Sequence, residues 1–100
     1  MKKNNTVDFQ DFLTEKLQDP KLAVAYLNEA LKDEDERVFL LALKHVITAH
    51  GDDLTSIAKE AQLNRQNLYR MLSEKGNPRW NSLTSLFDVL GFQVQLSIKK

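Results

Sequence analysis

Apolar residues recur every three or four positions through the first half of the chain, which is the spacing of amphipathic α-helices. The spacing predicts three helices, over residues 8–17, 20–32 and about 35–50, of which the third is the most apolar. Asp19 and Pro20 are typical of a helix start, because the aspartate can accept hydrogen bonds from unpaired amides and proline fits the first helical position. Gly51 is expected to end the third helix.

The second half carries shorter apolar repeats, which polar residues interrupt more often. They predict helices over about 54–61, 65–73 and 80–90. Asp53 and Asn64 are expected to cap the first two of these helices, and Gly91 is expected to end the last one. Residues 74–78 contain glycine and proline, so we expect a loop there.

After Gly91 the pattern changes to strict alternation. Every second position is apolar, namely Phe92, Val94, Leu96 and Ile98, and the residues between them are polar. This alternation predicts a β-strand with one apolar face. Because a single strand cannot satisfy its backbone within an otherwise helical chain, we expect these residues to pair with a second copy and to form part of a homodimer contact.

These elements predict a mostly α-helical protein with five to six helices and one short C-terminal β-strand. One hundred residues suffice for a single domain with one modest core. Within it we distinguish an N-terminal segment with a short helix, a helical hairpin, a pair of short helices with a closing helix, and the C-terminal strand, over residues 1–18, 19–51, 52–91 and 92–100.

The net charge of the chain is zero, but the charges are unevenly distributed. Residues 1–50 carry seven Lys/Arg and nine Asp/Glu, whereas residues 51–100 carry seven and five. Between residues 65 and 80, four basic side chains stand against a single acidic one, Glu74. Positive charge is therefore concentrated in one segment, as an element that binds DNA requires.

The composition excludes several other classes. No apolar run approaches the roughly 20 residues of a membrane span, and the basic N-terminus is followed by polar residues rather than by the apolar stretch of a secretory signal. The absence of cysteine excludes disulfides and thiolate metal sites and is compatible with a reducing cytoplasm. We therefore expect a cytoplasmic protein without membrane contact and without a cofactor.

Residues 53–72 have the organisation of a helix-turn-helix: two short helices joined by the turn Gln62-Leu63-Asn64, with Leu63 expected to pack between them. The outward face of the second helix would present Arg, Gln and Asn side chains, which can form paired hydrogen bonds with guanine or adenine edges in the major groove. The residues predicted to contact bases are Arg65, Gln66, Asn67 and Arg70. Those predicted to contact the DNA backbone are Asn64, Tyr69, Lys75, Asn77, Arg79 and Asn81.

Each of these features also has a simpler interpretation. A polar helix face is often merely solvated, and the acidic run 33–36 lacks the glycine and ligand spacing of a calcium loop, so we interpret it as a solvated helix start.

His45 and His50 lie five residues apart, which does not place both on one helix face, so we expect surface or helix-end histidines rather than metal ligands. Trp80 is expected in the core, with an exposed interface anchor as the alternative. No motif in the sequence supports catalysis.

Residues 54–73, together with Gly76-Asn77-Pro78 and Leu90-Gly91, resemble the helix-turn-helix of phage repressors (XRE type). More narrowly, the chain resembles the putative addiction-module antidote proteins over roughly residues 8–93. The segments that carry this resemblance are Ala25–Leu31, Ala49-His50-Gly51, Leu68–Leu72 and Gly76–Arg79.

The resemblance implies a compact phage-repressor-like domain that binds operator DNA as a dimer, represses its own operon and neutralises a small toxin of the RelE/HigB kind. The apolar stripe from Phe9 to Leu31 is expected in the core; any exposed part of it would be the natural docking site for such a toxin.

Two positions depart from the family pattern. Leu54 stands where phage repressors often have a DNA-contacting glutamine, and Gln62 stands where glycine usually adopts a left-handed conformation, at a cost of roughly 1 kcal/mol. Two alternatives to an antitoxin therefore stay open: a stand-alone or prophage transcriptional regulator, and a helical interaction module that does not bind DNA.

Overall fold

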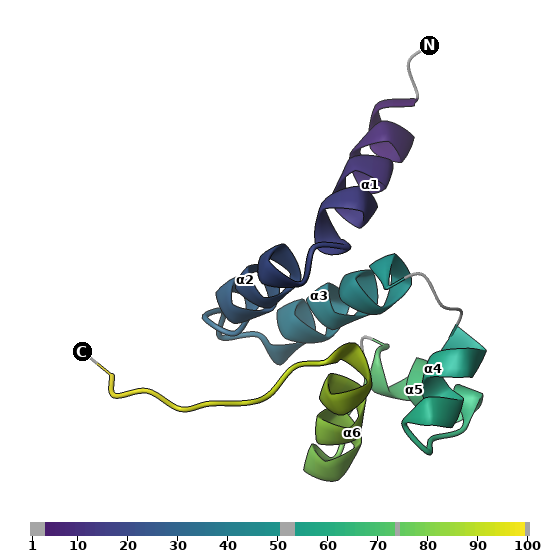
Figure 1. Ribbon diagram of the computed structural model, residues 1–100, viewed down its shortest axis with the longest axis vertical. Helices are drawn as coiled ribbons and strands as arrows, with labels where there is room; N and C mark the ends of the chain where they lie inside the picture. Colours follow the sequence, from purple (N-terminus) through teal and green to yellow (C-terminus); the bar gives the residue numbers. More distant parts are fainter. Residues whose placement is uncertain (1–3, 51–53, 74, 100) are drawn as a thin grey trace.

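The computed structural model describes residues 4–50, 54–73 and 75–99 and is helical except for turns and the C-terminal segment (Figure 1). The six helices in these residues are α1 (Asn4–Leu17), α2 (Pro20–Ala30), α3 (Glu36–Ala49), α4 (Leu54–Glu60), α5 (Arg65–Met71) and α6 (Trp80–Leu90). The prediction of a mostly helical chain is confirmed, and the boundaries agree to within a few residues, with α1 beginning four residues earlier than expected. The predicted roles of Gly51 and Asp53 lie outside the described residues.

Helices α1 and α2 both pack on α3, and α2 runs beside it (Figure 1). The predicted start of α2 is confirmed: Asp19 Oδ1 accepts a 2.9 Å hydrogen bond from the Lys21 amide, and Pro20 occupies the first turn. Helix α3 contributes the largest share of the core, because Leu43 and Ile47 on its inner face are fully buried. It is therefore the central helix that its apolar sequence predicted.

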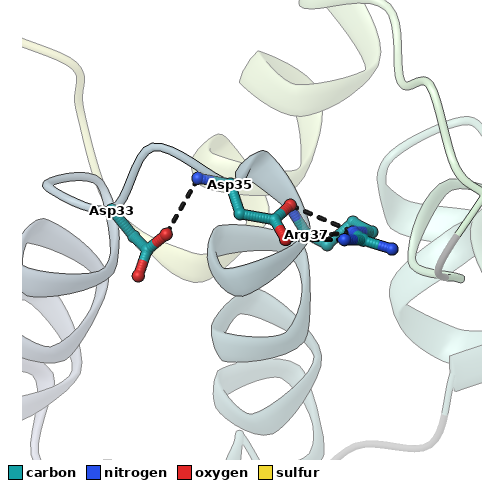
Figure 2. Close-up of polar contacts among 3 residues, drawn as sticks. All are labelled: Asp33, Asp35 and Arg37. Atoms are coloured by element: carbon teal, nitrogen blue, oxygen red, sulfur yellow. Dashed lines mark hydrogen bonds and ion pairs between the residues drawn. The ribbon is translucent and has the colours of Figure 1, made fainter.

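The turn between α2 and α3 is organised by two aspartates (Figure 2). Asp33 Oδ1 accepts a 2.8 Å hydrogen bond from the Asp35 amide, and Asp35 caps α3 by accepting from the Arg37 amide at 3.0 Å. The Arg37 guanidinium also lies 2.8 Å from Asp35 Oδ2. The hydrogen bonds from Arg37 lower the pKa of Asp35 to about 2, so this carboxylate stays ionised under all ordinary conditions.

Helices α4, α5 and α6 form a second group, joined to the first through contacts between α3 and α4. Ile57, Leu68 and Leu86, one from each helix, are fully buried and belong to the same cluster as the α3 residues. One continuous core therefore holds both groups. Among the described residues, no helix is both long and apolar enough to cross a membrane.

The β-strand predicted for residues 92–98 is not formed. Residues 92–99 run away from the end of α6 as an extended segment without strand pairing, below the α2–α3 turn in Figure 1. The physical reason is that the described part of the chain contains no second strand with which this segment could pair.

Several residues expected in the core are exposed. Phe9 and Phe12 on α1, and Leu31 at the end of α2, lie mostly in solvent, because α1 contributes to the core chiefly through Leu17. Trp80 is 64% exposed, so its expected place in the core is wrong and the alternative, an exposed apolar anchor, agrees with the structure. It occupies the first turn of α6, where its side chain lies outside the core.

The expectation of surface or helix-end histidines is confirmed for His50, at the end of α3, and is wrong for His45. The His45 side chain is half-buried, and its Nδ1 lies 2.7 Å from the Tyr26 hydroxyl, which joins α3 to α2. Burial, assisted by the charge of Lys44, lowers the pKa of His45 below 6.5, and burial raises the pKa of Tyr26. The neutral imidazole is therefore the form that the fold favours.

This contact predicts a pH-dependent stability. Because the pKa of His45 is lower in the folded chain than in the unfolded one, the unfolded chain binds more protons as the pH falls through about 6.5, and the free energy of unfolding decreases. Urea titrations at pH about 7.5 and about 5.5 should show this loss, and His45→Asn should reduce it. An unchanged pH dependence in the variant would contradict the assignment.

Candidate nucleic-acid interface

The turn that positions α5 begins at the end of α4. The Leu63 amide donates to the Ala58 carbonyl at 2.7 Å, and the Gln62 amide donates to the Lys59 carbonyl at 3.1 Å. This pair of hydrogen bonds is a Schellman motif, whose central residue adopts the left-handed conformation. Gln62 does so with φ of 61°, as expected from its place in the sequence pattern. The turn therefore exists despite the missing glycine.

Leu63 and Asn64 connect this turn to α5. Leu63 is half-buried and packs on the core, as predicted, so it fixes the path of the chain between the two helices. Asn64 Oδ1 accepts a 2.7 Å hydrogen bond from the Asn67 amide, which confirms Asn64 as the N-cap of α5. Since that oxygen is engaged in the cap, a DNA contact predicted for Asn64 would have to come from other atoms of the residue.

Helix α5 has one buried and one exposed face. Leu68, Met71 and the following Leu72 are buried against the core. The side chains on the other face are exposed; they are Arg65, Gln66, Asn67, Tyr69 and Arg70. All four residues predicted to contact bases thus lie together on one solvent-facing surface of α5.

Arg65 is held along this surface by Tyr69, one helical turn further on. Its Nη2 donates a 3.3 Å hydrogen bond to the Tyr69 hydroxyl, and its guanidinium carbon lies 5.4 Å from the centre of the Tyr69 ring. This contact with the Tyr69 ring restricts the conformation of the Arg65 side chain.

Further polar residues follow α5, in the loop before α6 and in the first turn of α6. Lys75, Asn77, Arg79 and Asn81, the predicted backbone contacts, are all exposed. Gly76 lies so close to α5 that a Cβ atom there would overlap the Met71 carbonyl oxygen, so any other residue would displace the loop. Glycine at this position therefore allows the loop to fold back on α5.

The arrangement suits hydrogen bonding to an anionic polymer. Four cationic side chains, Arg65, Arg70, Lys75 and Arg79, are exposed along α5 and its following loop. In the described part of the chain, no three His, Cys, Asp or Glu side chains lie together as metal ligands would. The surface offers amide and guanidinium donors, which both phosphates and base edges accept.

The strained Gln62 predicts a stabilising substitution. Gln62→Gly should raise the free energy of unfolding by about 0.5–1 kcal/mol, because glycine adopts a positive φ without the Cβ penalty, an advantage that its greater freedom in the unfolded chain partly offsets. Gln62→Ala is the matched control and should bring no such gain. Urea denaturation of the three proteins measures the difference; equal stabilities would contradict strain at this turn.

Two comparisons with known proteins give matches that cover nearly the whole chain. Residues 6–98 match the model of a family described as "probable addiction module antidote protein". A Haemophilus influenzae protein described as uncharacterized is 30% identical over 92 residues, which cover 91% of this chain and 93% of the relative. No solved structure gives a significant match. From the family match over residues 6–98, we conclude that the chain belongs to the probable addiction module antidote proteins.

Proposed function

We propose that this protein is a DNA-binding antitoxin that represses its own toxin-antitoxin operon as a homodimer. The observation that supports DNA binding most directly is the exposed face of α5, which is anchored by the fully buried Leu68. The side chains on this face that are proposed to contact bases are Arg65, Gln66, Asn67 and Arg70. An anchored helix with such donors on its outer face is what a phage-repressor-like (XRE-type) helix-turn-helix inserts into the major groove.

The surrounding loop supports this proposal through its charge. Lys75 and Arg79 would neutralise phosphates on either side of the groove, and Asn77 and Asn81 would add uncharged hydrogen bonds that fix the position of α5 on the duplex. In a homodimer the two α5 helices would enter successive major grooves, about 34–36 Å apart, so the operator would be an inverted repeat. A cytoplasmic location follows from this role.

The antidote family implies a toxin as partner. We propose that the toxin is a small protein of the RelE/HigB kind, encoded next to this chain, and that it docks on the exposed apolar part of α1 around Phe9 and Phe12. Co-expression with the neighbouring gene and co-purification of the two products tests this partnership. A neighbouring gene of unrelated composition, whose product does not co-purify, would instead favour a stand-alone or prophage regulator.

The DNA-binding part is tested by fluorescence anisotropy with the DNA upstream of the protein's own gene. A scrambled duplex of the same length and composition is the control, and the salt concentration is varied at about 50–200 mM. We expect the native sequence to bind at least about 1,000-fold more tightly than the scrambled one. Equal affinities for both duplexes, or none for either, would favour a helical interaction module that does not bind DNA.

A further inference from the structure

An apolar groove of about 530 Å³ lies between α2, the start of α3, α6 and the C-terminal segment. Its walls include Leu31, Phe39, Trp80, Phe87, Val94 and Leu96. Trp80 and Leu31 are mostly exposed there. Large apolar side chains gathered around one groove are typical of a surface that another chain covers.

The C-terminal segment, which forms one side of this groove, is itself incompletely packed. Leu96 is 96% exposed and Ile98 is 93% exposed, whereas Phe92 at its start packs on the core. Among the backbone hydrogen bonds found in the described chain outside the helices, none involves residues 93–99. The segment thus presents both an apolar face and unpaired backbone groups, as an edge strand without its neighbour does.

The groove also has an acidic edge, formed by Asp33, Glu34 and Glu36 in the α2–α3 turn. Two basic residues flank this turn, and each lies beside a carboxylate. Lys32 lies 3.3 Å from Glu29, and Arg37 pairs with Asp35 as Figure 2 shows. This edge of the groove is therefore negatively charged, which favours a basic segment as the occupant of the groove.

The chain carries a segment with the matching chemistry. Residues 93–100 combine alternating apolar side chains with two terminal lysines, Lys99 and Lys100. An apolar groove with an acidic edge and an apolar segment with a basic end are complementary, and both belong to one chain. Such self-complementarity is what a two-fold symmetric interface requires, because each protomer supplies both halves.

We propose that the groove of each protomer receives the C-terminal segment of a second copy. The two segments pair antiparallel across the two-fold axis, Leu96 and Ile98 of one protomer cover the groove beside Trp80 of its partner, and Lys99 faces the acidic turn. The proposal rests on the proposed homodimer and assigns the surface that forms it. It leaves the exposed face of α5 free for DNA.

Sedimentation velocity at micromolar concentration, without DNA, tests the proposal directly. We expect the wild-type protein to be a dimer and Leu96→Asp to raise the dimer dissociation constant at least 100-fold. Because Leu96 is exposed in the single chain, this substitution leaves the fold intact, which circular dichroism can verify. Leu41→Asp, at an exposed leucine of α3 away from the groove, is the matched control and should remain dimeric.

Three further measurements locate the contact. Trp80 is the single tryptophan, so its emission should shift to the blue as the protein dimerises, in wild type but not in Leu96→Asp. The chain has no cysteine, so single cysteines placed in turn at residues 94–98 should form inter-chain disulfides most readily at the position next to the two-fold axis. Glu34→Lys with Glu36→Lys should weaken the dimer, and Lys99→Glu with Lys100→Glu should restore it.

A monomeric wild-type protein would overturn both this proposal and the proposed homodimer. A dimer that Leu41→Asp dissociates and Leu96→Asp does not would overturn this proposal alone. Groove variants that stay dimeric but lose the toxin would overturn it as well and would assign the groove to the toxin. None of these measurements uses DNA, so their failure is distinguishable from failure of the proposed DNA binding. Conversely, Arg70→Ala should dimerise as the wild type does even where it loses DNA affinity.

Discussion

Leu68→Ala should lower the free energy of unfolding by about 3–5 kcal/mol, one of the two largest effects that we expect of a single substitution. Leu68 is fully buried where α5 packs on the core, so truncation leaves a cavity that neighbouring helices cannot readily fill. Domains of this size are stable by about 5–15 kcal/mol in total, so the loss is a large share of the whole.

Urea denaturation followed by circular dichroism measures this effect. Gln66→Ala is the matched control, because it lies on the same helix but on the exposed face, and it should change stability by less than about 0.5 kcal/mol. In thermal unfolding, Leu68→Ala should lower the melting temperature by roughly 10–30 °C. A loss below about 1 kcal/mol would mean that α5 is not anchored in this way, and the surface built on it would lose its basis.

The helices could be predicted from the sequence because their causes are local. Each repeats apolar residues at helical spacing, and the caps Asp19 and Asn64 act on amides within three residues. The left-handed turn at Gln62 was expected from the resemblance instead, since glycine usually takes that conformation at this place in the family pattern. The orientation of α5 followed from its own apolar face, Leu68, Met71 and Leu72.

The features that were missed depend on residues distant in sequence. The strand over 92–98 has the right alternation, but a strand requires a neighbour, and within the described chain that neighbour is absent. The burial of His45 depends on Tyr26, nineteen residues earlier, and the exposure of Trp80 depends on how α6 meets the core. The local sequence pattern therefore predicts the helices and which of their faces are apolar. It does not predict which apolar faces stay exposed to solvent.

Under the proposed function, we expect Arg65→Ala and Arg79→Ala to change DNA binding in different ways, and this difference is the second prediction of large effect. Arg65 lies on the exposed face of α5, where Tyr69 restricts its conformation, so its loss should remove base contacts. We expect the preference for the native over the scrambled duplex to fall by about 1–3 kcal/mol, or roughly 5- to 150-fold. Affinity for the scrambled duplex should change little.

Arg79 precedes α6 in an exposed position, with no cap hydrogen bond from its side chain, and is expected to meet a phosphate. Arg79→Ala should therefore weaken binding to both duplexes alike, and the slope of log affinity against log salt should become shallower by about 1 per site. Lys44→Ala removes the same charge from an exposed position on α3 and should leave both quantities unchanged. If instead Arg65→Ala and Arg79→Ala both bind DNA as the wild type does, neither arginine contacts DNA. The DNA-binding surface would then lie elsewhere on the protein.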